Sequence, residues 1–285
     1  MRLINFRNGN GHVNIGAVTD AGVINLTEAG LPDSIDALLA GGHAAWVQAT
    51  TAVSNGKASL KLSELTLLPP VLNPSKAIAV GLNYVDHAAE SPYKDAPKYP
   101  VLFQRFPSSW VAHDQPLVKP KVSDDFDYEG EVAVIIGKSG RYISKVDALS
   151  YVAGYSIFND GSIRDYQFKS HQWMMGKNFD ATASFGPVFV SADELPAGAV
   201  GLQLQTRLNG EILQDANTRD MIFDVATVIS VCSEVFELQP GDIIISGTPA
   251  GVGFARKPPI FMKQGDVVEV EVEGLGVLRN AVVNE

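Results

Sequence analysis

Two glutamates open a run of five apolar residues in the segment Asp127-Tyr128-Glu129-Gly130-Glu131-Val132-Ala133-Val134-Ile135-Ile136. Uninterrupted apolar runs of this kind are typical of strands that are covered on both faces of a sheet. Glu129 and Glu131 are two residues apart, and in a strand such residues point to the same face. The segment therefore predicts a buried strand with two carboxylates side by side at its start.

Two like charges this close together are costly unless a cation or a proton lies between them. Carboxylates are the ligands that hard divalent ions such as Mg²⁺ or Mn²⁺ prefer, so the spacing favours a metal site. The alternative is a solvated strand face, which we infer for Glu269, Glu271 and Glu273 because polar and apolar residues alternate there. The two segments differ in the apolar run that follows Glu131. This run predicts a buried strand, and charges at the start of a buried strand need partners, which favours the metal site for Glu129 and Glu131.

The composition is that of an ordinary globular protein. The 285 residues are 46% hydrophobic and 19% charged, which allows a sizeable core in one large or two unequal domains. No stretch reaches the roughly 18 apolar residues needed to span a bilayer, and the N-terminus lacks a secretory apolar region. The single cysteine suits a reducing compartment. We therefore expect a cytoplasmic protein.

The charge balance is acidic. The formal net charge is −10, from 22 basic and 32 acidic residues, and the basic residues form no cluster. Such a surface is unfavourable for nucleic acid and for anionic membranes. We expect neither as a partner.

The sequence divides into a small N-terminal unit, residues 1–68, and a larger unit, residues 69–285. In the first unit a helix is expected to begin near residues 33–34, where Gly41-Gly42 can break it, and Leu67-Leu68-Pro69-Pro70 marks the boundary. Short strands are predicted at residues 2–6, 12–19 and 23–26.

The larger unit is rich in strands. Asn209-Gly210 between two alternating segments is a strong hairpin signal. Apolar residues recur at helical spacing from Met221 to Phe236, and Pro240-Gly241 follows as a stop. Strands dominate without regular alternation of strand and helix, so the expected fold class is α+β rather than doubly wound. Further strands are predicted at residues 76–80, 132–136, 152–158, 187–190 and 243–245.

A second polar group follows the strand predicted at residues 76–80. His87 and Glu90 are three residues apart and would share one face of a helix, with Asn83 as its cap. A carboxylate beside an imidazole orients it and raises its basicity, which suits the activation of a water molecule. Taken alone, such a pair is more often a surface feature.

Two further segments carry isolated charges. Asp160 ends the apolar strand predicted at residues 152–158 and is either a third metal ligand or a cap of the turn. Lys177 is a lone lysine in Trp173-Met174-Met175-Gly176-Lys177-Asn178-Phe179-Asp180, and buried lysines are rare unless they are paired or functional.

A glycine-rich loop, Ser246-Gly247-Thr248-Pro249-Ala250-Gly251-Val252-Gly253, follows the strand at residues 243–245. It lacks the lysine and the spacing of nucleotide-binding loops. Its backbone N–H groups can receive an anionic ligand, with the Thr248 hydroxyl alongside; a tight structural turn is the alternative. No G-x-S-x-G elbow occurs, which disfavours a serine hydrolase.

Taken together and in this order, these segments resemble the fumarylacetoacetate hydrolase (FAH) superfamily, in particular its bacterial acylpyruvate hydrolase and 2-hydroxyhepta-2,4-diene-1,7-dioate isomerase-like members. The resemblance spans residues 70–285, whereas the first 65 residues match only the variable N-terminal unit of bacterial members. The matching segments are residues 81–90, 127–131, 154–167, 176–180, 186–187, 209–211 and 240–253.

The resemblance implies a mixed β-sandwich or roll with flanking helices and a small N-terminal α+β unit. It also implies a homodimer and a bound Mg²⁺ or Mn²⁺. By position, Glu129, Glu131 and Asp160 would be the metal ligands, and His87 with Glu90 would activate water on a mobile lid. Residues 91–100, with three prolines and two lysines, suit such a cover, although an ordinary surface loop is the alternative.

The resemblance also implies substrate contacts. Lys177 and Thr248 would contact the substrate, and Arg164 and Gln167 match the segment after the metal aspartate, with Gln167 placed to orient Lys177. Many members have Phe-x-Lys-Pro before the metal motif, where this chain has Phe103-Gln104-Arg105-Phe106-Pro107. Because an arginine can hold a carboxylate through two hydrogen bonds, we expect Arg105 to bind a substrate that differs from the commonest ones.

The resulting expectation is a metal-dependent hydrolase that cleaves a C–C bond in a 2,4-dioxo acid of the acylpyruvate or fumarylpyruvate type. His87, oriented by Glu90, would activate the water, and Lys177 would stabilise the oxyanion. The first alternative is a 2-oxo-acid decarboxylase or a hydroxymuconate-type isomerase on the same metal site, for which enolate stabilisation is sufficient. The second is a non-catalytic sensor on the same fold, which the presence of His87, Glu90 and Lys177 disfavours.

Overall fold

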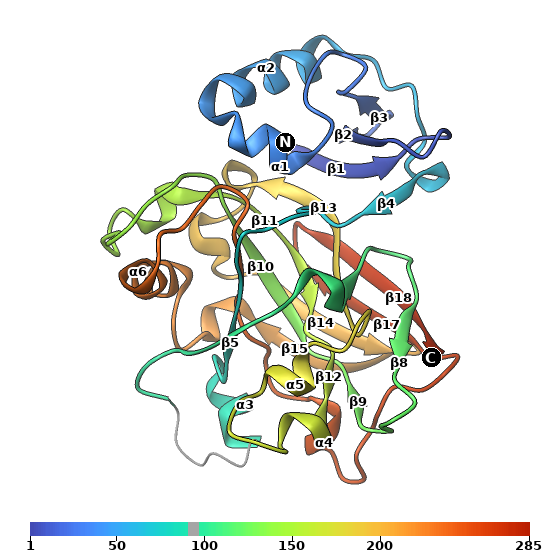
Figure 1. Ribbon diagram of the computed structural model, residues 1–285, viewed down its shortest axis with the longest axis vertical. Coiled ribbons are helices and arrows are strands. Elements are labelled where there is room, and N and C mark those ends of the chain that lie inside the picture. The colour runs from blue at the N-terminus through green and yellow to red at the C-terminus, as the bar shows by residue number, and fades with distance from the viewer. Residues whose placement is uncertain (91–96) are drawn as a thin grey trace.

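The protein is built around one large mixed sheet (Figure 1). The computed structural model describes residues 1–90 and 97–285, so the expected cover at residues 91–100 lies largely outside the described residues. Within the described part, the large sheet runs in the order β3 (Gly22–Asn25), β2 (Val13–Thr19), β1 (Arg2–Arg7), β13 (Ala183–Ser191), β11 (Val152–Asn159), β10 (Gly130–Ile136), β16 (Ile243–Ile245), β5 (Ala77–Gly81) and β6 (Val101–Gln104), with β4 (Thr66–Leu68) on β1 and β7 (Trp110–Val111) on β13.

A smaller sheet packs on the large one. One hydrophobic core joins Val132 and Val134 of the large sheet to Leu204 and Val270 of the smaller sheet. This packing of two sheets confirms the α+β, sandwich-like fold class. The smaller sheet has the order β15 (Glu211–Asn217), β14 (Gln203–Leu208), β17 (Val267–Val272), β18 (Gly276–Asn284) and β8 (Leu117–Lys119), and β9 (Phe126–Asp127) pairs separately with β12 (Ser162–Ile163).

Helices are short and lie outside the sheets (Figure 1). None of those in the described residues is both long and apolar enough to cross a membrane. They are α1 (Ile35–Ala40), α2 (Gly42–Asn55), α3 (Val85–Glu90), α4 (Arg164–Gln167), α5 (Met174–Lys177) and α6 (Val225–Val235).

Strand β10 is buried along its whole length, as the apolar run predicts. It lies between β11 and β16. Val132, Val134 and Ile136 pack into the core shared with the smaller sheet, whereas Ala133 and Ile135 pack into a second core on the opposite face. Side chains alternate between faces, so this strand contributes to both cores at once.

The N-terminal segment forms a lobe at one end of the long axis, opposite α3, α4 and α5 (Figure 1). Strand β4 ends at Leu68, where the boundary is predicted. The lobe nevertheless continues the large sheet, because β1 pairs with β13, with Leu3 opposite Phe189. The predicted helix is divided into α1 and α2 at Gly41, and the Ser34 hydroxyl caps α1.

Helix α6 begins at Val225, four residues later than the apolar spacing predicts. The Asp224 carboxylate accepts a hydrogen bond from the Thr227 N–H at 2.8 Å and so caps the helix. The preceding residues are held elsewhere, since the Ile222 N–H donates to the Asn83 carbonyl and the Phe223 N–H to the Asn83 side chain, both at 2.8 Å. The prediction that Met221–Phe223 are helical is therefore wrong, because hydrogen bonds to the distant residue Asn83 hold this segment outside the helix.

Candidate metal centre and active site

Three carboxylates meet where β10 and β11 lie side by side. Gly130 pairs with Asn159, which brings Asp160 next to Glu129, and the Asp160 N–H donates to the Glu129 carbonyl at 2.8 Å. One oxygen from each of Glu129, Glu131 and Asp160 lies within 4.8 Å of the others, and all three side chains are buried. Three buried carboxylates that converge on one point match the donor set of a hard divalent ion.

Lys177 lies between two of these carboxylates. Its Nζ donates to Glu129 Oε2 at 2.6 Å and to Asp160 Oδ2 at 2.7 Å, and its side chain is 2% exposed. The neighbouring Gly176 allows α5 to approach α4 closely, because a Cβ there would lie 2.4 Å from the Gln167 backbone nitrogen. The fold therefore directs the lone lysine to the predicted metal ligands.

Arg164 is a second buried cation that contacts the acids. Its guanidinium lies 2.6 Å from Glu129 Oε1 and donates to Asp127 Oδ2 through Nε at 2.8 Å. It also donates to Gln167 Oε1 at 2.9 Å. Gln167 therefore orients Arg164, in place of the expected contact with Lys177, because the Lys177 ammonium is directed to the carboxylates.

Arg105 lies behind Asp160. Its Nη1 donates to Asp160 Oδ1 at 2.6 Å and to the Gly161 carbonyl at 3.1 Å, and the Ser109 hydroxyl accepts from Nη2 at 3.1 Å. The side chain has no exposed surface, and Arg105 is absent from the described residues that line the cavity. Arg105 therefore does not reach the cavity where a substrate contact was expected; it orients the Asp160 carboxylate instead.

Asp127 organises the site, a role that the sequence did not predict. Its carboxylate accepts hydrogen bonds from the N–H groups of Gly253 and Phe254 at 2.8 and 3.0 Å, in addition to Arg164. The side chain is fully buried. The sequence did contain a signal for this role: Asp127 is the first residue of the acidic segment that opens the buried strand. A charge buried there requires several hydrogen-bond donors.

The glycine-rich loop contacts the same acids. The Gly247 N–H donates to Glu131 Oε2. The Thr248 hydroxyl donates to the Gly130 carbonyl at 3.0 Å and accepts from Gln214 at 2.8 Å, so both neighbours fix its orientation. The loop thus supports Glu131 and brings Thr248 to the cavity.

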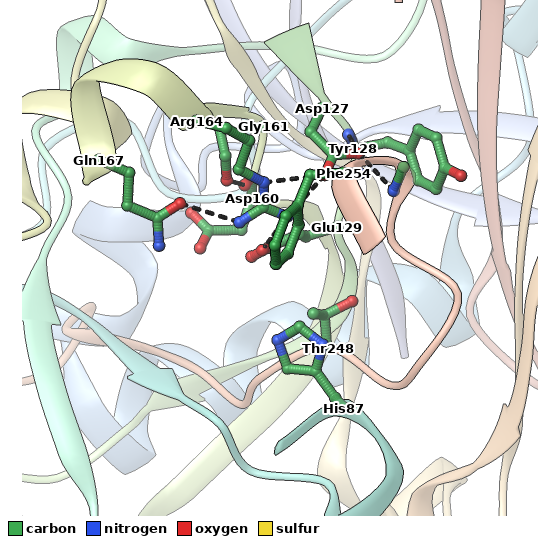
Figure 2. A network of polar contacts seen from close by, with 12 residues as sticks. His87, Asp127, Tyr128, Glu129, Asp160, Gly161, Arg164, Gln167, Thr248 and Phe254 are labelled. Carbon is green, nitrogen blue, oxygen red and sulfur yellow. Dashed lines mark hydrogen bonds and ion pairs between the residues drawn. The ribbon is translucent and has the colours of Figure 1, made fainter. Parts of the chain in front are cut away.

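His87 faces the acids from α3. Its ring lies across the site from Arg164 and Gln167 (Figure 2), and Thr248 lines the same cavity. The distance from His87 Nδ1 to Glu90 Oε2 is 3.9 Å, which exceeds hydrogen-bond length. The predicted pair is therefore adjacent but not hydrogen-bonded.

One cavity collects these side chains. Aromatic rings of Phe103, Phe168, Trp173 and Phe254 surround the polar groups. Such a site combines a cation position, an ammonium and an imidazole within apolar walls. The polar residues lining it are His87, Glu129, Glu131, Asp160, Arg164, Gln167, Lys177 and Thr248.

Comparison with known proteins identifies the family. Residues 76–283 match the family model described as fumarylacetoacetate (FAA) hydrolase C-terminal. The chain belongs to this family. Over 290 residues it is 40% identical to the human mitochondrial oxaloacetate tautomerase FAHD2A, a match that covers 99% of this chain and 92% of that protein.

Solved structures of the family extend the comparison. A maleylpyruvate hydrolase from Sphingobium sp. SYK-6, in complex with manganese(II) and pyruvate, has a TM-score of 0.83 at 27% identity and covers 100% of this chain and 99% of its own. A 5-carboxymethyl-2-hydroxymuconate delta-isomerase from Mycobacterium smegmatis has a TM-score of 0.78 at 31% identity, covering 100% and 99%. The same fold thus carries hydrolase, isomerase and tautomerase names.

The pKa values of Glu131 and Glu129 are shifted in opposite directions. Burial raises the pKa of Glu131 well above its usual range, and the charges of Asp160 and Glu129 raise it further. Burial acts on Glu129 in the same direction, but Lys177, Arg164 and His87 outweigh it and lower the pKa of Glu129 to about 2. Of these two acids, Glu131 therefore favours the protonated form more strongly when no cation compensates its charge.

Metal binding should accordingly release a proton and strengthen as pH rises. A carboxylate must be ionised to bind a metal. Below the raised pKa of Glu131, a proton therefore competes with the metal for this side chain. The affinity should level off once pH exceeds that pKa. Isothermal titration in buffers of different ionisation enthalpy will measure the proton release; an affinity that does not change with pH above the usual pKa range of a carboxyl group would contradict the assignment.

Proposed function

We propose that this protein is a divalent-metal-dependent tautomerase that interconverts the enol and keto forms of oxaloacetate. The observation that carries the proposal is the buried cluster of Glu129, Glu131 and Asp160, with Lys177 between two of them and His87 in the same cavity. Similarity to FAHD2A along 99% of the chain supports the choice of substrate.

Mg²⁺ or Mn²⁺ would be held by Glu129, Glu131 and Asp160. When bound, such an ion supplies Lewis-acid stabilisation of the charge on a 2-oxo acid and its enolate. The buried donor set fits the ion, and the manganese in the maleylpyruvate hydrolase complex supports this assignment. Arg105 holds Asp160 in place from behind, and Arg164 holds Glu129 from the side of the cavity.

The remaining residues bind the substrate and move the proton. Lys177 would donate to the developing enolate oxygen, where a fixed cation lowers the barrier most. His87 would transfer the proton at C3, since its imidazole lines the cavity and an imidazole can both accept and donate a proton. Arg164, Gln167 and Thr248 would contact the carboxylates of the substrate, and the aromatic walls would exclude water.

Hydrolysis of an acylpyruvate is the second candidate. The maleylpyruvate hydrolase shares the fold over the whole chain, and a base beside an enolate-stabilising site can also activate water. In that reaction His87 would deprotonate the water that attacks the 4-carbonyl. The 3.9 Å separation from Glu90 makes the imidazole less well oriented for this step.

Parallel assays separate the two candidates. Protein loaded with Mg²⁺ or Mn²⁺ is given enol-oxaloacetate in one assay and acylpyruvates of increasing length in another. The tautomerase proposal predicts rapid loss of the enol absorbance and slow or absent release of pyruvate from the acylpyruvates. Efficient pyruvate release with no effect on enol-oxaloacetate would assign hydrolysis instead.

Replacing His87 with alanine should lower kcat by about 10²–10⁴-fold, the usual contribution of a positioned acid–base group. The metal affinity should change little, because the three carboxylates remain. Steady-state kinetics and metal titration of the same preparation will test this. A His87→Ala enzyme with wild-type kcat would remove the imidazole from the reaction.

The expected homodimer and the cytoplasmic location stay predictions. Sedimentation of the metal-loaded protein will test the first. The human and rat oxaloacetate tautomerases carry the word mitochondrial in their names, so location is best determined directly by imaging a tagged chain.

A further inference from the structure

The Glu90 carboxylate is bound by a backbone group rather than by His87. The Gly251 N–H donates to Glu90 Oε1 at 3.1 Å and to Oε2 at 3.0 Å. His87 Nδ1 is buried and has no hydrogen-bond partner among the residues that the structure describes. The Glu90 carboxylate therefore accepts from the glycine-rich loop, and within the described residues it makes no hydrogen bond to the adjacent imidazole nitrogen.

The Gly251 N–H is held in a fixed direction. Gly251 has φ +100°, and a Cβ at this position would lie 2.1 Å from the Leu213 carbonyl oxygen, so no other residue fits without a shift. Its carbonyl accepts hydrogen bonds from the Tyr128 hydroxyl at 3.1 Å and from Arg256 Nε at 3.2 Å. The residue that donates to Glu90 is therefore held in place by the surrounding structure.

Gly251 connects α3, through its N–H, to the acidic segment that precedes β10, through its carbonyl. Tyr128 immediately precedes Glu129, so its hydroxyl links the acidic segment to the loop that binds Glu90. The other end of α3 is anchored separately, since the Asn83 side chain donates to the Ser246 carbonyl at 2.7 Å. A helix of six residues is too short to be stable alone, so contacts such as these at its two ends are needed to hold it in place.

We propose that Glu90 is a positioning residue whose carboxylate docks α3 on the Gly251 N–H and thereby fixes His87 over the three acids. In this role Glu90 does not act as the orienting partner of the imidazole. The role of His87 rests on the proposed function, whereas the docking itself does not. A bond from a backbone N–H to a carboxylate is charge-assisted, which suits it to hold a short helix.

Two variants separate docking from charge pairing. Glu90→Gln keeps an oxygen that can accept from Gly251 and removes the charge, whereas Glu90→Ala removes both. Docking predicts that Glu90→Gln stays within about fivefold of wild-type kcat, because a neutral bond has roughly half the strength. Glu90→Ala should lose about 10–100-fold, as is common when a group that positions a site residue is removed.

Amide hydrogen exchange of residues 84–90 gives a readout that is independent of substrate. Exchange should accelerate in Glu90→Ala and stay close to wild type in Glu90→Gln, with unchanged thermal midpoints showing that the fold persists. Equal activity losses in both variants with unchanged exchange would overturn the proposal and favour charge pairing with His87. If wild-type protein fails to act on oxaloacetate while this exchange pattern holds, the proposed function fails and the docking role stands.

Discussion

Glu131→Gln should abolish metal-dependent turnover and weaken metal binding. The side chain is buried, and glutamine keeps its shape and an acceptor for the Gly247 N–H while losing the charge. Changes in groups that merely orient a ligand typically cost about 10–100-fold in metal affinity, so loss of a charged ligand should cost more. Metal titration and the dependence of kcat on free Mg²⁺ or Mn²⁺ measure both effects.

Glu271→Gln provides the matched control. It lies in β17, where glutamates also alternate, but its carboxylate pairs with Arg207 at the surface at 2.7 Å. Turnover and metal affinity should be unchanged in this variant. Full activity of Glu131→Gln in chelator-treated protein would remove the metal from the account.

Lys177→Met should lower kcat by about 10²–10³-fold, the typical cost of removing one donor to a developing oxyanion. Metal affinity should be equal to or greater than that of the wild type, because the ammonium is bonded to Glu129 and Asp160, which would hold the ion. Without metal, the variant should unfold at a lower temperature, since two buried carboxylates then lack their shared counter-charge.

Lys138→Met is the corresponding control, because Lys138 lies over the Tyr151 ring outside the cavity. Its kinetics should match the wild type. A Lys177→Met enzyme with normal kcat and weakened metal binding would show that the lysine supports the acids without contributing to the chemical step.

Local sequence patterns predicted the elements around the site. The apolar run of β10 requires cover on both faces, and Asn209-Gly210 suits a turn with positive φ at both residues, as observed at +54° and +84°. The pair Glu129 and Glu131 could be predicted because the two residues are two apart at the start of a buried strand. Asp160 was added to them by the family resemblance, and the pairing of β10 with β11 brings it next to Glu129.

Contacts between distant segments could not be predicted in this way. The start of α6 depends on Asn83, which lies 140 residues from Phe223 in the sequence. Arg105 is near the acids in the family pattern, but whether it faces substrate or Asp160 depends on the buried position of Ser109 and Gly161. The position of Glu90 likewise depends on the backbone of Gly251, and sequence spacing carries no information about that peptide.

Deuterium incorporation at C3 of oxaloacetate tests the central claim most directly, since enol formation at this metal site must exchange that hydrogen. The reaction is followed by mass spectrometry in D₂O with metal-loaded protein and with the same concentration of free metal alone. We predict faster exchange with the protein, and chelator or Glu131→Gln should reduce it to the rate of the protein-free reaction. Exchange at the rate of free metal with the wild-type protein would contradict the account.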